Sequence, residues 1–139
     1  MSLMNKEQIM EIIPHRDPFL LIDTIEEMEP GQRVVATKYM KEDEFWFKGH
    51  FPGVPGVLML EMLAQAGAVA MLALPENKGK IGLFGGVKDA KFRRQVVPGD
   101  LLKLEVEIIK VKGPIGVGKA LATVNGEKAV SAEITFAIK

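Results

Sequence analysis

The sequence predicts an α+β fold in which one antiparallel sheet covers a single long helix. A helical segment from about Val57 to Leu72 is apolar nearly all round, a pattern typical of a helix that is buried on every side. Segments with the alternation and β-branched content of strands lie before and after it, and turn signals separate them. No repeat, low-complexity tract or linker interrupts this order, so we expect one domain over residues 1–139.

A short helix and a hairpin are predicted ahead of the long helix. Residues Asn5 to Ile13 have an amphipathic pattern that Pro14 closes. The stretch FLLIDTIEEMEPGQRVVATKYM predicts two strands around a turn at Pro30-Gly31. Met1 to Leu3 fit an expression leader ahead of a natural start at Met4, so no function is assigned to them.

Four strand segments are predicted after the long helix. The stretch LLKLEVEIIKVKG has the clearest alternation, with apolar residues at every second position from Leu102 to Ile108. In GKALATVNGEKAVSAEITFAIK, Asn125-Gly126 predicts a tight hairpin between two arms. The remaining segment, KIGLFGGVKDAKF, predicts a strand whose glycines permit a close backbone approach. Together the segments suffice for a sheet that wraps the helix.

Composition excludes several classes of partner. Lys plus Arg (18) balance Asp plus Glu (18) and no basic run stands out, so we expect no nucleic-acid partner. The longest apolar run is broken by Glu61, Gln65 and Gly67 before it reaches membrane-spanning length, and the start lacks a signal-peptide core, so we expect no membrane partner. The absence of cysteine excludes disulfides and thiolate chemistry and agrees with a cytoplasmic location.

No metal or cofactor is expected either. His15 and His50 are the only histidines, and neither has carboxylates at ligand spacing. The glycines of GLFGGVKD do not form the G-x-G-x-x-G dinucleotide fingerprint. Ser2 and Ser131 are the only serines and lie outside any G-x-S-x-G elbow, so a serine nucleophile fits badly.

The candidate chemistry lies in GHFPGVPGVLMLEMLAQ. Glu61 and Gln65 are four residues apart and therefore share one face of the helix, where a buried carboxylate needs donors, a bound proton or an opening onto a cavity. His50 precedes a loop of glycines and prolines, and the free amides of Gly56 and Val57 at the helix N-terminus can bind an oxygen that gains negative charge. A proton acceptor, a proton donor and an anion site together suit enolate chemistry beside a thioester.

Each of these residues also has a structural interpretation. Loop histidines such as His15 are most often structural, and His50 considered alone would be as well. Its combination with Glu61 favours the functional interpretation. For Gln65, orientation of the Glu61 carboxylate and simple packing support remain open alternatives.

Several motifs together resemble the bacterial β-hydroxyacyl-acyl-carrier-protein dehydratases of type II fatty acid synthesis. They occur in order over nearly the whole chain as IPHRDPFLLID, GHFPG, PGVLMLEMLAQAGAVAML, RRQVVPGD and GEKAVSAEITF. The resemblance implies the hotdog fold, a long central helix wrapped in an antiparallel sheet. It also implies homodimers whose sheets join edge to edge, often assembled into a hexamer as a trimer of dimers, with the active site at the dimer interface.

The resemblance also implies roles for particular residues. His50 would be the catalytic histidine and Glu61 the catalytic glutamate, supplied by opposite subunits, and the N–H of Gly56 would bind the thioester carbonyl. We also expect Val57, from its free amide at the helix N-terminus, and Gln65, from its position one turn after Glu61, in the substrate site. The substrate would be a (3R)-hydroxyacyl thioester on acyl carrier protein, dehydrated to the trans-2-enoyl thioester without a cofactor. The basic residues that follow a strand are either carrier-protein docking residues or a solvated edge; they are Lys91, Arg93 and Arg94.

The chain departs from the family pattern in two places. Where the family has H-F-P-x-x-P-x-x-P-G-V-L, this chain has HFPGVPGVL, three residues shorter on the His50 side of the helix. Three extended residues span at most about 10 Å, enough to displace a catalytic loop unless something compensates. The step from Gly56 to Glu61 keeps the family spacing. Asp17 also replaces a frequent aromatic residue, which leaves any gating role of that position open.

Three functions are therefore carried forward. The first is a hydro-lyase, a 3-hydroxyacyl-acyl-carrier-protein dehydratase of fatty acid synthesis. The second is a hotdog acyl thioesterase, in which the same helix N-terminus and carboxylate activate water against the thioester carbonyl. The third is a non-catalytic acyl-binding protein, if the shortened loop has disabled the site. Turnover of an enoyl thioester, release of free thiol and binding without turnover would distinguish them.

Overall fold

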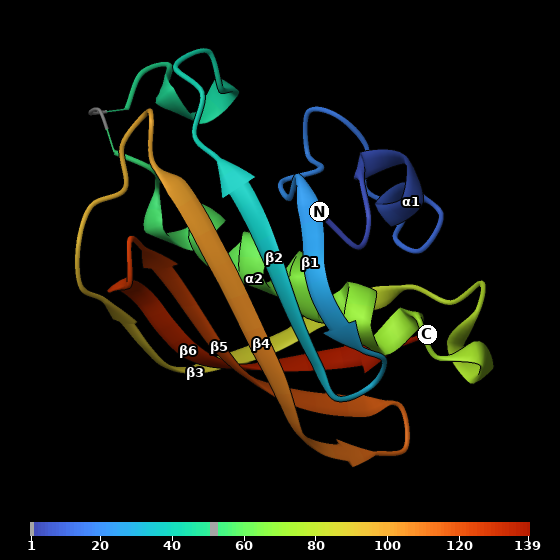
Figure 1. Ribbon diagram of the computed structural model, residues 1–139. Helices are drawn as coiled ribbons and strands as arrows, with labels where there is room; N and C mark the ends of the chain where they lie inside the picture. The colour runs from blue at the N-terminus through green and yellow to red at the C-terminus, as the bar shows by residue number, and fades with distance from the viewer. Residues whose placement is uncertain (1, 51–52) are drawn as a thin grey trace.

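One curved sheet and one long helix make up most of the molecule (Figure 1). The computed structural model describes residues 2–50 and 53–139; Met1 and two residues of the GHFPG motif, Phe51 and Pro52, lie outside the described residues. The six strands pair antiparallel in the order β1-β2-β4-β5-β6-β3. The elements are α1 (Lys6–Met10), β1 (Thr24–Glu29), β2 (Arg33–Tyr39), η1 (Phe45–Phe47), α2 (Gly56–Leu72), η2 (Pro75–Asn77), β3 (Gly82–Phe92), β4 (Leu101–Lys112), β5 (Ile115–Val124) and β6 (Glu127–Ile138).

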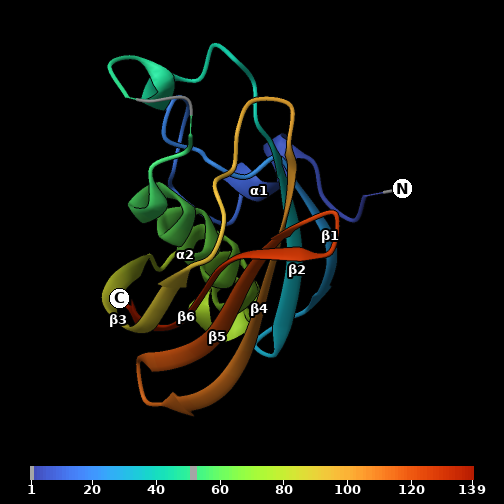
Figure 2. The ribbon, with the colours of Figure 1, turned by 90° about the vertical axis from the view of Figure 1, so that its left-hand side faces the viewer.

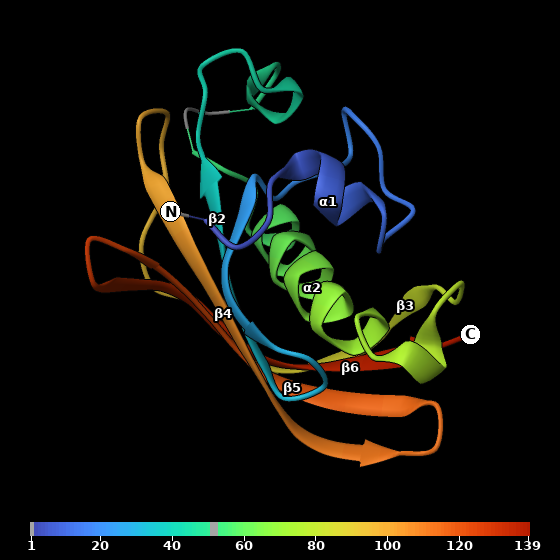
Figure 3. The ribbon, with the colours of Figure 1, turned by 45° about the vertical axis from the view of Figure 1, so that its right-hand side comes forward.

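The helix α2 lies across the concave face of the sheet, and the strands bend around it (Figure 3). Every residue from Met62 to Leu72 is buried. A Cβ atom on Gly67 would lie 2.3 Å from the Phe136 ring of β6, so helix backbone packs directly against a sheet side chain. The segment before β1 covers another side, where the N–H of Leu21 donates to the side chain of Gln65 at 2.8 Å. The predicted burial on every side is confirmed.

The predicted strands and hairpins are confirmed, with small shifts of their ends. In β4, Leu102, Leu104 and Val106 are buried against α2, and Ile108 is half-buried near the end of the row. The β5–β6 turn places Asn125 (φ 50°) and Gly126 (φ 80°) in the left-handed region, as a two-residue type I′ hairpin requires.

The first helix is shorter than the sequence suggests. It ends at Met10 instead of Ile13, and a capping box begins it, in which Asn5 accepts from the N–H of Gln8 and Gln8 accepts from the N–H of Asn5. Ile9 and Ile13 are both buried, so the apolar periodicity continues past the last helical residue. No helix within the described residues is long and apolar enough to cross a membrane.

Strand β3 forms one edge of the sheet, beside β6 (Figure 2). No strand in the described part of the chain pairs with its other edge. From the sequence, ordinary core positions are favoured for four apolar residues, with the lining of an acyl tunnel as the alternative, but their side chains are about two fifths exposed; they are Leu83, Phe84, Val87 and Ile115. The first three belong to this edge strand, which accounts for their exposure, and Ile115 begins β5 at the tip of the β4–β5 hairpin.

Candidate functional site

Glu61 opens onto a small cavity beside the first residues of β3. The cavity has a volume of about 200 Å³ and is lined by His15, Glu61, Ala64, Gln65, Ala68, Gly82, Leu83, Phe84 and Phe136. The Glu61 side chain is 23% exposed, so the carboxylate is neither sealed in the core nor free in solvent. Of the three sequence-based possibilities for this carboxylate, the structure shows both a donor and a cavity.

Gln65 fixes the orientation of that carboxylate. Its Nε2 donates to Glu61 Oε2 at 3.0 Å and to the carbonyl oxygen of Phe19 at 2.9 Å, while its Oε1 accepts from the N–H of Leu21 at 2.8 Å. Because the backbone N–H can only donate and the carbonyl can only accept, the two ends of the amide are determined. Gln65 is 1% exposed and has its oxygen and nitrogen both bonded. Both sequence alternatives, orientation and packing support, therefore describe this residue.

His15 is a second neighbour of the carboxylate. Its Nε2 lies 3.6 Å from Glu61 Oε2, and its side chain is 22% exposed in the same cavity. The sequence favours a structural role for this histidine because it lies in a loop, and nothing in the local pattern relates it to Glu61, 46 residues later. The spatial proximity arises because Gln65 binds residues 19 and 21, which holds the preceding loop against α2.

His50 and the N-terminus of α2 line a different cavity. It has a volume of about 580 Å³ and is lined by His50, Val54, Pro55, Gly56, Val57, Met59, Phe92, Arg93, Arg94 and Gln95. The Nδ1 of His50 lies 2.9 Å from the carbonyl oxygen of Gly53. Since a carbonyl only accepts, Nδ1 carries the proton, and the lone pair of the neutral ring is on Nε2. This tautomer is the one a general base requires.

Phe92 explains why the helix begins with glycine. A Cβ atom on Gly56 would lie 2.7 Å from the Phe92 ring, closer than real side chains approach one another. The aromatic ring thus lies against the first turn of α2, where the N–H groups of Gly56 and Val57 have no partner within the helix itself. The sequence predicted an anion-binding N–H at Gly56 but did not reveal that Phe92 lies against this residue.

Within one chain the structure does not bring all predicted residues together. His50, Gly56 and Val57 share one cavity, and Glu61 and Gln65 share another. The two cavities adjoin opposite ends of the edge strand: Gly82, Leu83 and Phe84 line the first, and Phe92 lines the second. No group of three or more His, Asp or Glu side chains within residues 2–50 and 53–139 could hold a metal ion.

The three predicted basic residues differ in their surroundings. Arg94 is engaged with its own chain, 3.5 Å from Asp100 and 3.4 Å from Glu127. Lys91 and Arg93 are exposed, and Arg93 borders the His50 cavity. These surroundings favour Lys91 and Arg93 over Arg94 as residues that could meet a partner.

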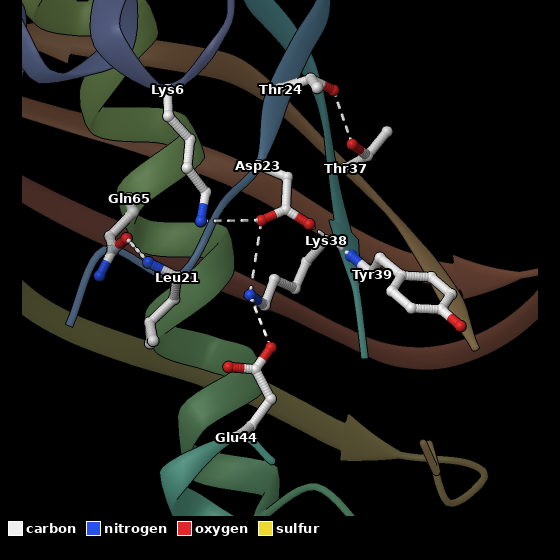
Figure 4. A network of polar contacts seen from close by, with 9 residues as sticks. All are labelled: Lys6, Leu21, Asp23, Thr24, Thr37, Lys38, Tyr39, Glu44 and Gln65. Carbon is white, nitrogen blue, oxygen red and sulfur yellow. Dashed lines mark hydrogen bonds and ion pairs between the residues drawn. The ribbon is translucent and has the colours of Figure 1, made fainter. Parts of the chain in front are cut away.

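Sequence reasoning missed a buried lysine near the site. Lys38 of β2 is 3% exposed and forms ion pairs with Asp23 and Glu44 (Figure 4). A signal was present: Val34, Ala36 and Lys38 alternate, so they share the helix-facing side of the strand. A charged residue in an apolar row indicates a buried ion pair.

The family comparison agrees with this geometry. The sequence model of the FabA-like domain matches residues 13–133. A 3-hydroxyacyl-acyl-carrier-protein dehydratase FabZ from Clostridium acetobutylicum is 64% identical over 135 residues, 95% of this chain and 96% of the relative. FabZ from Clostridium novyi is 61% identical over 135 residues, 95% of each chain. FabZ from Oceanobacillus iheyensis is 58% identical over 140 residues, 99% of this chain and all of the relative; that span exceeds the 139 residues here, so this chain lacks at least one residue that the relative has.

Solved structures confirm the hotdog fold. The dehydratase heterocomplex ApeI:P from Xenorhabdus doucetiae superposes with a TM-score of 0.82 at 15% identity, over 94% of this chain and 90% of that one. A thioesterase from Pseudomonas aeruginosa superposes with a TM-score of 0.73 at 15% identity, over 99% and 95% of the two chains. At these identities the likeness concerns the fold alone, since the same fold supports different chemistries.

Proposed function

The chain belongs to the FabA-like family, and from this premise we propose that it removes water from 3-hydroxyacyl thioesters on acyl carrier protein, with His50 and Glu61 as its catalytic residues. The product is the trans-2-enoyl thioester of fatty acid synthesis, and the enzyme is a hydro-lyase. Relatives that carry this activity in their names are 58–64% identical over nearly the whole chain.

The observation that carries the residue assignment is the placement of His50 beside the N-terminus of α2. The unprotonated Nε2 takes the α-proton of the substrate. The electrons move toward the thioester carbonyl, whose oxygen gains negative charge, and the N–H groups of Gly56 and Val57 at the positive end of the helix dipole stabilise it. Base and oxyanion site border one cavity, so a single bound thioester can reach both.

Glu61 completes the reaction. Its carboxyl group in the protonated form donates a proton, directly or through one water, to the departing 3-hydroxyl, which leaves as water. Return of the α-proton from His50 to Glu61 through solvent restores both groups for the next turnover. Gln65 holds Oε2 by a hydrogen bond of 3.0 Å, which restricts rotation of the carboxyl group that lines the cavity.

A homodimer would bring the two catalytic residues together. Around a two-fold axis, edge strands β3 from two copies would pair antiparallel, so the start of one strand lies near the end of the other. The Glu61 cavity adjoins the start of β3 and the His50 cavity adjoins its end. His50 of one subunit and Glu61 of the other would then line one site. Further assembly into a hexamer, and a cytoplasmic location, stay predictions from the sequence.

The carrier protein is expected to dock beside the His50 cavity. Lys91 and Arg93 offer exposed positive charge there for an acidic carrier, whereas Arg94 already neutralises Asp100 and Glu127. Replacing Lys91 and Arg93 by Ala should raise KM for the carrier-bound substrate and leave KM for a short thioester unchanged. Equal KM values for both substrates in this variant would remove the docking assignment.

Hydration of a trans-2-enoyl thioester, followed by loss of its conjugated absorbance, tests the proposal. His50→Ala and Glu61→Ala should each lower turnover by about 100-fold or more, the usual contribution of a general acid or base. Far-ultraviolet circular dichroism checks that both variants are folded. Free thiol release by the natural protein would support the thioesterase, and binding of acyl carrier without turnover would support the acyl-binding protein.

A further inference from the structure

Lys38 places a positive charge on the core side of β2. Its side chain is 4% exposed and follows Val34 and Ala36 on the face that packs toward α2. Burying an ammonium group is costly unless partners compensate its charge, so its neighbours decide what it does.

The lysine binds two carboxylates that belong to different parts of the fold (Figure 4). Its Nζ lies 2.8 Å from Glu44 and 3.4 Å from Asp23. Asp23, immediately before β1, also accepts from the N–H of Tyr39 at 2.7 Å and lies 3.4 Å from Lys6 of α1. Asp23 therefore ties together the start of the chain and the two first strands, whereas Glu44 lies beyond the end of β2.

A ring on the loop side adds a further contact. Nζ of Lys38 lies 5.6 Å from the centroid of the Trp46 ring, within the range of a cation–π interaction. Trp46 is 5% exposed and belongs to η1, four residues before His50. Lys38 thus contacts two positions of the segment Glu44–Phe47, which leads into the catalytic loop.

The loop from Met40 to Pro55 has other contacts besides Lys38, among them the ring contact of Phe45 with Phe19 and the burial of Trp46 in the core. At its two ends it binds the segment 96–100: the N–H of Val54 donates to Val96 O at 2.8 Å, and the N–H of Met40 donates to Asp100 O at 2.9 Å. In the described part of this loop, regular structure between these ends is confined to the turn η1. The ammonium group of Lys38 contacts the loop between these ends, at Glu44 and Trp46, and so adds a charged contact to them.

We propose that Lys38 is a positioning residue for catalysis, whose ammonium group clamps Glu44 and Trp46 and so fixes the loop that carries His50. The inference rests on the proposed function of His50. Because a shift of about 1 Å in a catalytic group can lower the rate roughly a hundredfold, a charged clamp in mid-loop has a direct effect on turnover.

Two variants remove the clamp and a third serves as the matched control. Lys38→Met keeps the aliphatic stem and removes the charge, and Glu44→Gln removes the loop carboxylate while Lys38 keeps Asp23. Both should lower kcat by roughly tenfold to a hundredfold with little change in KM. Asp23→Asn removes the carboxylate on the strand side and should lower the melting temperature but leave kcat near that of the natural protein.

A spectroscopic readout tests the clamp without reference to activity. Trp46 is the only tryptophan in the chain, so its fluorescence reports on this loop alone. Lys38→Met and Glu44→Gln should shift its emission to the red and increase its quenching by acrylamide, whereas Asp23→Asn should not. The double variant Lys38→Met/Glu44→Gln should lose no more kcat than the worse single variant, because each single substitution already breaks the same Lys38–Glu44 interaction.

These measurements distinguish a failure of the Lys38 clamp from a failure of the proposed function. Unchanged Trp46 quenching and kcat in folded Glu44→Gln would overturn the clamp, even if Lys38→Met fails to fold. An equal loss of kcat in Asp23→Asn would show that the cluster supports the fold as a whole and would also overturn it. A natural protein without turnover would contradict the proposed function, while the fluorescence of the same variants would still test the clamp.

Discussion

At the scale of single residues, Gln65 contributes both to the stability of the fold and to the orientation of Glu61. One buried amide satisfies two backbone groups of residues 19–21 and one oxygen of Glu61. The backbone contacts keep the loop that contains His15 against α2, and the side-chain contact orients the carboxylate. Removing the amide should therefore affect both unfolding and turnover.

Gln65→Leu provides that test. The N–H of Leu21 and the carbonyl of Phe19 would lose their partner in a buried place, at roughly 1–3 kcal/mol for each unsatisfied group. We expect the free energy of unfolding, measured in urea, to fall by about 2 kcal/mol or more, and kcat to fall because Glu61 is no longer oriented.

Gln32→Leu is the control for this prediction, because Gln32 is an exposed glutamine of the same size. It should change neither quantity appreciably. A Gln65→Leu protein with normal stability and normal kcat would contradict the role of the amide; normal kcat with lowered stability would restrict that role to packing.

At the scale of elements, α2 and β6 approach each other at Gly67. A Cβ atom there would lie 2.3 Å from the Cζ of Phe136, whose side chain is 1% exposed and cannot move away freely. Alanine is the better helix former by about 1 kcal/mol, so helix propensity predicts that Gly67→Ala raises the free energy of unfolding, whereas packing predicts that it lowers it. Overpacking in a dense core costs about 1–3 kcal/mol and should outweigh it.

We expect Gly67→Ala to unfold at lower urea concentration than the natural protein. Replacing Phe136 by Leu makes room for the new methyl group, so the alanine should cost less in that background. A double-mutant cycle measures this coupling. A stabilised Gly67→Ala protein would show that the helix can shift away from β6 and that the close approach is not required.

The same elements show how much of the fold follows from the sequence. The all-round apolar segment predicted the bounds of α2 to within one residue. A helix that is buried on every side is a continuous apolar run, and such a run is easy to recognise in a sequence. The Asn125-Gly126 turn predicted the last hairpin. The helical spacing of Glu61 and Gln65 predicted their contact, which depends only on α-helix geometry.

Contacts between distant segments could not be predicted in the same way. His15 lies near Glu61, and Phe92 lies against Gly56, because the sheet and loops close around α2. No periodic pattern in the sequence relates the two residues of either pair. The exposure of Leu83 and Val87 follows from the edge position of β3, which the order of strands along the chain does not reveal. The burial of Lys38 could have been predicted from its place in an apolar row of β2. Its ion-pair partners, Asp23 and Glu44, could be identified only from the structure.

At the scale of the whole molecule, the edge strand β3 determines whether the proposed site can exist. Its outer edge has exposed apolar side chains that include Val87, 42% exposed near the middle of the strand. Pairing of two copies along β3 would bury this valine on both sides of the two-fold axis. A charge there would be removed from water without a partner.

Val87→Glu should therefore dissociate the proposed dimer and abolish turnover together, as measured by light scattering after size exclusion and by the hydration assay. Val111→Glu is the matched control, since Val111 is 54% exposed at the far end of β4. It should stay dimeric and active. A fully active Val87→Glu monomer would contradict the shared site.

The most direct test of the central claim is complementation between inactive subunits. His50→Ala and Glu61→Ala would be expressed together with different tags, and assemblies that carry both tags would be assayed for hydration of a trans-2-enoyl thioester. Each mixed dimer has one site with both groups intact, so activity should return to as much as about half of the natural value. Mixed assemblies without activity would show that each subunit uses its own His50 and Glu61, contrary to the proposal.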